Sequence, residues 1–137
     1  MGMGNYPCFA EVIEEDFVKE QCPELLDKLK ILLDKLDISF DQFATYFDES
    51  QGNDMLADGI SLEDQKTLHE AYHDLQDEFE QKTGLILLVI YTCDEDEADR
   101  GCEVTGGCWS VGGVYQLSPA GEKYKDKIER KFWTVFG

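Results

Sequence analysis

Two histidines and a glutamate stand at a spacing that could hold a catalytic metal. They lie in the segment His69-Glu70-Ala71-Tyr72-His73, which has the pattern H-E-x-x-H. On a helix, residues i and i+4 share one face, so the two imidazoles could bind one Zn²⁺ ion while the glutamate acts as a general base. The chemistry of such a site would be metal-assisted hydrolysis.

This five-residue segment resembles the zinc-binding helix of metallopeptidases. The resemblance implies that His69 and His73 are metal ligands and that Glu70 is the general base. The apolar stripe of the same helix lies about 100° from both histidines by the helical period, near Leu68 and Leu75. We therefore interpret the histidines as a surface pair of slightly raised basicity, with no metal and no cofactor. A small zinc-dependent hydrolase is kept as an alternative function.

Acidic residues dominate the composition. The 137 residues include 30 Asp and Glu against 12 Lys and Arg, which gives a net charge of −18. Residues 1–106 alone carry −20, and residues 107–137 carry +2. Binding to nucleic acid or to an anionic membrane depends on Lys and Arg, so the charge argues against both. The sequence favours a basic protein as the partner.

We predict a cytoplasmic, non-enzymatic interaction protein that inhibits a nuclease or another nucleic-acid-handling protein by occupying its basic groove. Such a protein would act as a nucleic-acid mimic, of the anti-defence or immunity type. A further alternative is binding through an apolar patch, with the charge serving solubility only. The predicted partner-binding carboxylates lie on a long helix and in an acidic loop: Asp74, Asp77, Glu78, Asp94, Glu95, Asp96, Glu97 and Asp99.

Three other features carry weaker functional interpretations. The five cysteines are odd in number, have no C-x-x-C spacing and follow no secretory signal, so we expect reduced thiols in a reducing cytosol. A zinc or redox role for Cys93, Cys102 and Cys108 is an alternative. The carboxylates at Asp94 and Asp96 could belong to a calcium loop, although the rest of that pattern is misplaced. An aromatic group is expected to pack in the core or, alternatively, to anchor an interface: Trp109, Tyr115, Phe132 and Trp133.

Capping signals divide the first 84 residues into four helices. Acidic residues 14–16 suit the first turn of a helix that ends near Cys22, and Pro23 suits the start of the next helix. Capping boxes start two more helices, at Ser39 with Gln42 and at Ser61 with Asp64, and Thr83-Gly84 ends the last one. The leucine stripe expected on the second helix is Leu25, Leu29, Leu32 and Leu36, widened by Leu26 and Leu33. The stripe expected on the fourth helix is Leu62, Leu68, Ala71, Tyr72, Leu75 and Phe79.

The remaining residues change to a strand pattern. We predict a strand over residues 85–92, a hairpin at Gly112-Gly113 that joins residues 109–111 to 114–116, and a terminal helix that starts at Ser118-Pro119 with Tyr124, Ile128 and Phe132 inward. The predicted class is α+β in a single domain, 1–137. In that fold the N-terminal helices and one long helix pack on a small antiparallel β-meander, with a C-terminal helix.

Residues 114–121 resemble the strand-to-helix exit of winged-helix proteins. The resemblance implies a wing-like hairpin. The helix in the place of the recognition helix, residues 61–82, is acidic, so DNA binding is not carried over.

Overall fold

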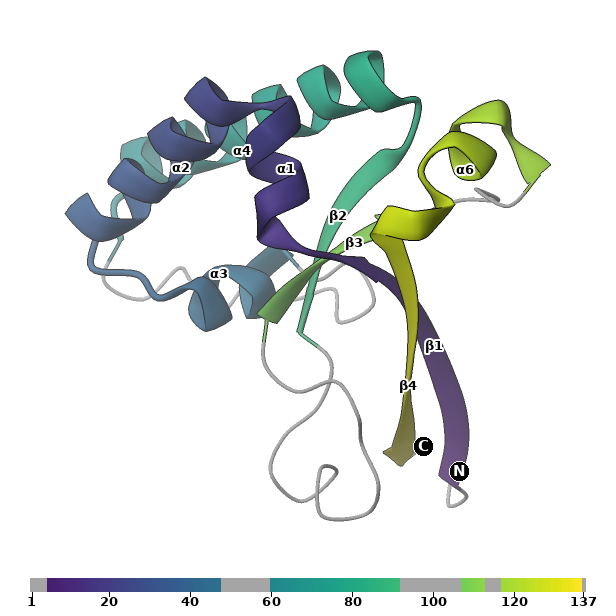
Figure 1. Cartoon of the computed structure of the whole chain (residues 1–137). Helices are drawn as coiled ribbons and strands as arrows, with labels where there is room; N and C mark the ends of the chain where they lie inside the picture. The colour runs from purple at the N-terminus through teal and green to yellow at the C-terminus, as the bar shows by residue number, and fades with distance from the viewer. Residues whose placement is uncertain (1–4, 48–59, 92–106, 113–116, 137) are drawn as a thin grey trace.

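The computed structural model describes residues 5–47, 60–91, 107–112 and 117–136, and for residues 5–9 and 132–136 it describes the backbone only. Helices and strands alternate in blocks along the chain (Figure 1). Their bounds, in chain order, are β1 (Asn5–Ile13), α1 (Glu15–Gln21), α2 (Pro23–Lys35), α3 (Phe40–Phe47), α4 (Leu62–Thr83), β2 (Ile86–Tyr91), β3 (Gly107–Gly112), α6 (Pro119–Lys123), η3 (Lys125–Lys127) and β4 (Ile128–Phe136).

The four strands form one antiparallel sheet in the order β2-β3-β1-β4. β3 pairs with β2 along its whole length and with β1 over Glu11–Ile13. β1 and β4 pair along all nine of their residues, from Asn5 with Phe136 to Ile13 with Ile128. These two strands run out from the body side by side, and both chain termini lie at their far end (Figure 1). The first and last strands are therefore neighbours.

Helices α1 to α4 cover the face of the sheet that carries the inward side chains of β2 and β3. Along β2, Leu87 and Val89 are buried while Ile86 is exposed, as the two-residue period of a strand requires. Phe43 of α3 packs edge-on against Tyr72 of α4, with 5.3 Å between ring centroids. The core therefore lies between the helices and the β2–β3 half of the sheet, and it positions α4.

The α+β class is confirmed, and so are the starts of the four helices. Ser39 and Gln42 form the predicted reciprocal capping box, with N–H to side-chain oxygen distances of 2.9 and 3.1 Å. On α2 the buried stripe consists of Leu26, Leu29 and Leu33, and the predicted Leu25, Leu32 and Leu36 are only half-buried. All three buried leucines belong to the predicted stripe, but its centre lies on Leu26, Leu29 and Leu33, because neighbouring leucines left the sequence pattern compatible with either line.

The predicted C-terminal helix is wrong in its extent. Ser118 caps α6 as predicted, with its Oγ accepting from the Gly121 N–H at 2.9 Å, but the helix ends at Lys123. The chain continues through η3 into β4, so Ile128 and the residues after it belong to a strand. β1 (Asn5–Ile13) lies where no helix or strand was predicted. In place of the predicted meander, the sheet has β1, from the start of the chain, as a central strand and β4, from its end, as an edge strand.

The predicted hairpin at Gly112-Gly113 also requires correction. Trp109–Val111 is paired on one side with β2 and on the other side with β1, so both edges of this strand are occupied. Residues 114–116, the predicted hairpin partner, lie outside the described residues. The wing-like hairpin is not part of the described sheet.

Candidate functional site

Helix α4 is fixed at both ends by local hydrogen bonds. Ser61 Oγ accepts from the Asp64 N–H at 3.1 Å, and acidic residues in the first turn suit the positive end of the helix dipole. At the other end Gly84 adopts a left-handed φ of 78°. The Thr83 hydroxyl donates to the Phe79 carbonyl at 2.7 Å and accepts from the Leu85 N–H at 3.1 Å. These caps fix where the helix begins and ends.

The inward face of α4 agrees with the predicted stripe except at its start. Five of the six predicted residues are buried: Leu68, Ala71, Tyr72, Leu75 and Phe79. Leu62 is 83% exposed, so including it was wrong. Leu62 is the first residue of α4, at the edge of the helical layer. Helical periodicity shows which face of a helix is apolar, but it does not show how far along the helix that face is covered.

The opposite face of α4 carries a line of carboxylates, which we name the acidic row: Glu70, Asp74 and Asp77. All three residues are exposed, and their i, i+4, i+7 spacing places them on one side of the helix. In the part of the chain that the structure describes, none of them forms an ion pair. Their charges are therefore available to a partner.

Glu78, also predicted as partner-binding, points elsewhere. It forms an ion pair with Lys82 at 3.8 Å and accepts a hydrogen bond from the Cys22 thiol. Lys82 in turn donates to the Gln21 carbonyl at 2.7 Å. Burial, and then the hydrogen bond to Glu78, raise the pKa of Cys22 to about 11. Glu78 thus ties α4 to the junction of α1 and α2, and Cys22 stays a protonated thiol at neutral pH.

The two histidines of the H-E-x-x-H segment have different surroundings. His69 is half-buried, and its Nε2 shares a 2.9 Å hydrogen bond with the Tyr46 hydroxyl of α3. Its ring stands 4.7 Å from that of Phe47, edge to face. His73 is exposed, and its Nδ1 shares a 3.0 Å hydrogen bond with Gln76. His69 is therefore part of the α3–α4 contact.

The expected rise in basicity is wrong for His69. Burial, and then the nearby charge of His73, lower the pKa of His69. The two ring centroids are 6.2 Å apart, and among the described residues no group of three or more His, Cys, Asp or Glu side chains could hold a metal ion. Glu70, the general base of the hydrolase alternative, stands in the acidic row.

Several predicted site residues lie outside the described residues. These are the acidic loop with Asp94, Glu95, Asp96, Glu97 and Asp99, and also Cys93, Cys102 and Tyr115. Of the thiols whose side chains are described, Cys22 is buried and Cys108 is half-buried. Trp109 is 3% exposed and packs against Phe40 with 5.3 Å between ring centroids, so its predicted role in the core is confirmed.

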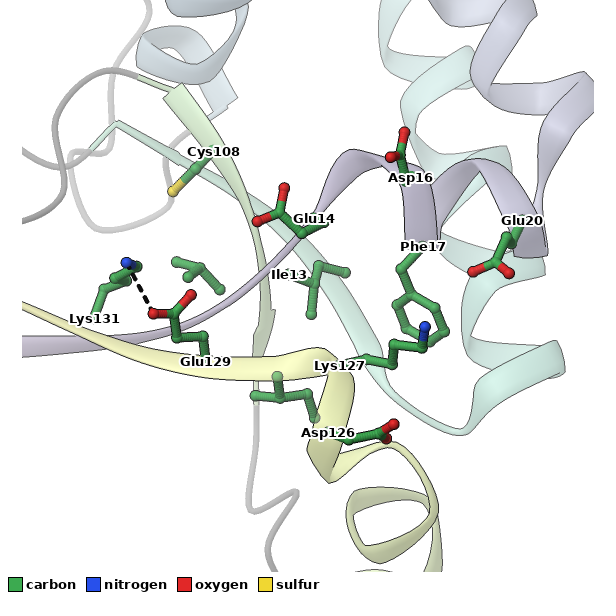
Figure 2. Close-up of a pocket in the computed structure, with 12 residues that line it drawn as sticks. Ile13, Glu14, Asp16, Phe17, Glu20, Cys108, Asp126, Lys127, Glu129 and Lys131 are labelled. Atoms are coloured by element: carbon green, nitrogen blue, oxygen red, sulfur yellow. Dashed lines mark ion pairs between the residues drawn. The ribbon is translucent and has the colours of Figure 1, made fainter.

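A cavity of about 830 Å³, not predicted from the sequence, lies where β1 turns into α1. It is lined by Val12, Ile13, Glu14, Asp16, Phe17, Glu20, Cys108, Asp126, Lys127, Ile128, Glu129 and Lys131. Figure 2 shows carboxylates around a patch of apolar side chains, and they come from both ends of the chain. Predicting it would have required the β1–β4 pairing, for which the β-branched and aromatic run over residues 132–136 was the available signal.

Within the described residues, no helix has the length and apolar character needed to cross a membrane. No family model, no curated protein and no solved structure matches the chain.

Proposed function

We propose that this protein is a non-enzymatic, cytoplasmic inhibitor that occupies the basic groove of a nuclease or another nucleic-acid-handling protein. The acidic row of α4 would make the contact, together with the acidic loop at 94–99. The observation that carries the proposal is the outward position of Glu70, Asp74 and Asp77, opposite the buried face of a capped helix and without an ion pair to any described residue. A rigid helix presents these charges without a further ordering cost.

The spacing of the row suits a surface built for phosphates. At 1.5 Å per residue, the seven-residue interval from Glu70 to Asp77 spans about 10 Å along the helix axis. One strand of duplex DNA places a phosphate about every 3.4 Å of its axis, so the row offers three negative charges over a length in which such a strand places about four phosphates. A basic groove that binds nucleic acid would meet a similar density of charge here.

The net charge supports association with such a groove. A total of −18 on 137 residues produces a long-range field that attracts basic surfaces and speeds encounter. Screening at physiological ionic strength limits this field to about 8 Å, so association should slow as salt rises.

The test captures partners from a cell lysate on the immobilised protein and then challenges the captured protein with duplex DNA or RNA. We expect nucleic acid to displace the partner, and the triple variant Glu70→Lys, Asp74→Lys, Asp77→Lys to lose capture. The matched control reverses three exposed acids of α2, Glu24→Lys, Asp27→Lys and Asp34→Lys, and changes the net charge equally. The control should retain capture.

Equal loss in both triple variants would show that net charge alone determines binding. A partner that nucleic acid does not displace, or whose capture is indifferent to salt, would also contradict the proposal.

A further inference from the structure

We propose that the cavity beside α1, here named the acidic groove, binds an arginine- or lysine-bearing segment of a protein partner, with the apolar stems of these side chains on its floor. This deepens the proposed function, because it rests on a basic protein partner and names a second contact surface on other elements. The groove is lined by the end of β1, α1, η3, β4 and Cys108 of β3.

The floor of the acidic groove is apolar. Ile13 and Phe17 belong to the hydrophobic core and expose 6% and 3% of their surface, and Val12 exposes 8%. Ile128 is half-buried and pairs with Ile13 across β1 and β4. Phe17 is held in place by Phe79, at 5.7 Å edge to face, and by Tyr124, at 5.2 Å. Ile128 and the small exposed parts of the buried side chains therefore form a fixed apolar floor for an aliphatic chain.

The rim of the groove is acidic and mostly unpaired. It carries five carboxylates and two lysines: Glu14, Asp16, Glu20, Asp126, Glu129, Lys127 and Lys131. Lys131 pairs with Glu129 at 3.0 Å, which leaves Lys127 as the other cation of the rim. Among the described residues, the remaining four carboxylates form no ion pair. Glu14, Asp16 and Glu20 come from one side and Asp126 from the other (Figure 2).

An apolar floor below a negative rim matches the side chains of arginine and lysine. Both bury their methylene stems along apolar surface and keep the charged head near water or carboxylates. A volume of about 830 Å³ lies within the usual range of ligand pockets and exceeds what one side chain needs. A short polypeptide segment, in which cationic and apolar side chains alternate, would complement both floor and rim.

The experiment measures binding of a fluorescein-labelled peptide of alternating arginine and leucine to the full chain, by polarisation and by amide chemical shifts. We expect the largest shifts in α1 and η3. Neutralising the rim with Asp16→Asn, Glu20→Gln and Asp126→Asn should weaken binding roughly tenfold. The matched control, Glu24→Gln, Asp27→Asn and Asp34→Asn, removes the same charge from exposed positions of α2 that line neither the groove nor the acidic row, and it should leave the affinity nearly unchanged.

Changes to the peptide test the floor without disturbing the fold. A peptide with serine in place of leucine should bind more weakly, because only the rim would remain to hold it. Equal weakening by the rim and control variants, shifts away from α1 and η3, or equal binding of the serine peptide would overturn the inference. Competition by spermine at equal concentration would assign the groove to a small organic cation instead.

Failure of the proposed function and failure of the acidic groove would give different results in these experiments. If the captured partner is not displaced by nucleic acid, but the peptide binds and responds to the rim variants, the acidic groove stands and the mimicry is wrong. If the partner is displaced and depends on the acidic row, but the peptide fails these tests, the groove is wrong and the mimicry stands.

Discussion

At the scale of single residues, side chains with the same sequence signal have different roles in the fold. His69 and His73 are the two ends of one motif, yet His69 bonds to Tyr46 of α3 and His73 faces water. Asp77 and Glu78 are neighbours in the acidic segment, yet one is free of ion pairs among the described residues and the other holds Lys82. Which neighbour lies beside each side chain depends on α3 and α1, and no local pattern in α4 specifies that.

The lowered pKa of His69 makes stability depend on pH. Burial disfavours its imidazolium in the folded protein, so the unfolded chain takes up the proton more readily. The free energy of unfolding should be undiminished above the ordinary pKa of 6.5 and fall as the pH drops from there through the lowered folded-state value. Urea unfolding at about pH 7.5 and pH 5.5 should show a larger loss for the wild type than for His69→Gln.

The matched control for this prediction is His73→Gln. It removes only the smaller cause of the shift, so most of the pH-dependent loss should remain. Equal losses in the wild type and His69→Gln would contradict the account. The same samples allow metal analysis, and one tightly bound zinc per chain that disappears with His69→Gln would favour the hydrolase alternative.

Two leucines of α4 give a matched test of the core. Leu75 is fully buried, and Leu75→Ala should cost about 2–5 kcal/mol because it leaves a cavity. Leu62 is 83% exposed, and Leu62→Ala should change the free energy of unfolding by no more than about 0.5 kcal/mol. Urea unfolding of both variants measures the difference. A loss at Leu62 as large as that at Leu75 would mean that the first turn of α4 is covered.

At the scale of elements, helices α1 to α4 could be predicted from the sequence, whereas strands β1 and β4 could not. Helix starts and ends are specified by nearby residues. Pro23, the Ser39–Gln42 pair and Gly84 each act within one turn of their own position. β1 and β4 instead stabilise each other from opposite ends of the chain. Ser118 caps α6 as predicted, but a cap specifies only where a helix starts, and the end of α6 at Lys123 has no comparable local signal.

The same limit applies to the candidate sites. Two members of the acidic row, Asp74 and Asp77, were predicted from the sequence as partner-binding residues. Glu70 entered only as the general base of the hydrolase alternative, and Glu78, the third predicted carboxylate of the helix, pairs with Lys82. The acidic groove joins α1 to η3 and β4, and its carboxylates meet only when the chain ends pair. A surface that lies on one element can be predicted from one segment of the sequence. A cavity between elements that are distant in the sequence can be predicted only if the tertiary contacts are known.

Gly84 supports the turn from α4 to β2 in two ways. Its φ of 78° is unfavourable for other residues, and a Cβ there would stand 2.9 Å from the Cβ of Ala120 in α6. Gly84→Ala should therefore lower the free energy of unfolding by about 1–3 kcal/mol in urea unfolding. Adding Ala120→Gly should recover only part of the loss, since it relieves the contact but not the backbone strain. Full recovery or no initial loss would contradict this.

At the scale of the whole molecule, the excess of negative charge opposes the compact state. A net charge of −18 repels itself, and like charges at i and i+4, such as Glu70 and Asp74, add a local cost in α4. A protein that keeps such an arrangement gains long-range attraction to basic partners and loses some stability. Stability and binding should therefore respond to salt in opposite directions.

This opposition gives a prediction for thermal unfolding. Raising sodium chloride should raise the melting temperature of the wild type by screening the repulsion. The variant Glu70→Gln, Asp74→Asn, Asp77→Asn should melt a few degrees higher at low salt and gain less from added salt. Calorimetry at low and physiological ionic strength measures both effects. A melting temperature that falls with salt would mean that favourable ion pairs outweigh the repulsion.

The side-by-side ends of β1 and β4 have a consequence for the order of folding (Figure 1). Asn5 pairs with Phe136, so the outer edge of β1, the first described strand, is closed only by β4, the last described strand. Such pairing raises the contact order, and the entropy of closing so long a loop slows folding. Helices α1 to α4 precede β4 in the chain, and the outer edge of β1 stays unpaired until β4 has been synthesised. A version cyclised through a short link between the termini would make β4 and β1 a local hairpin and should refold faster.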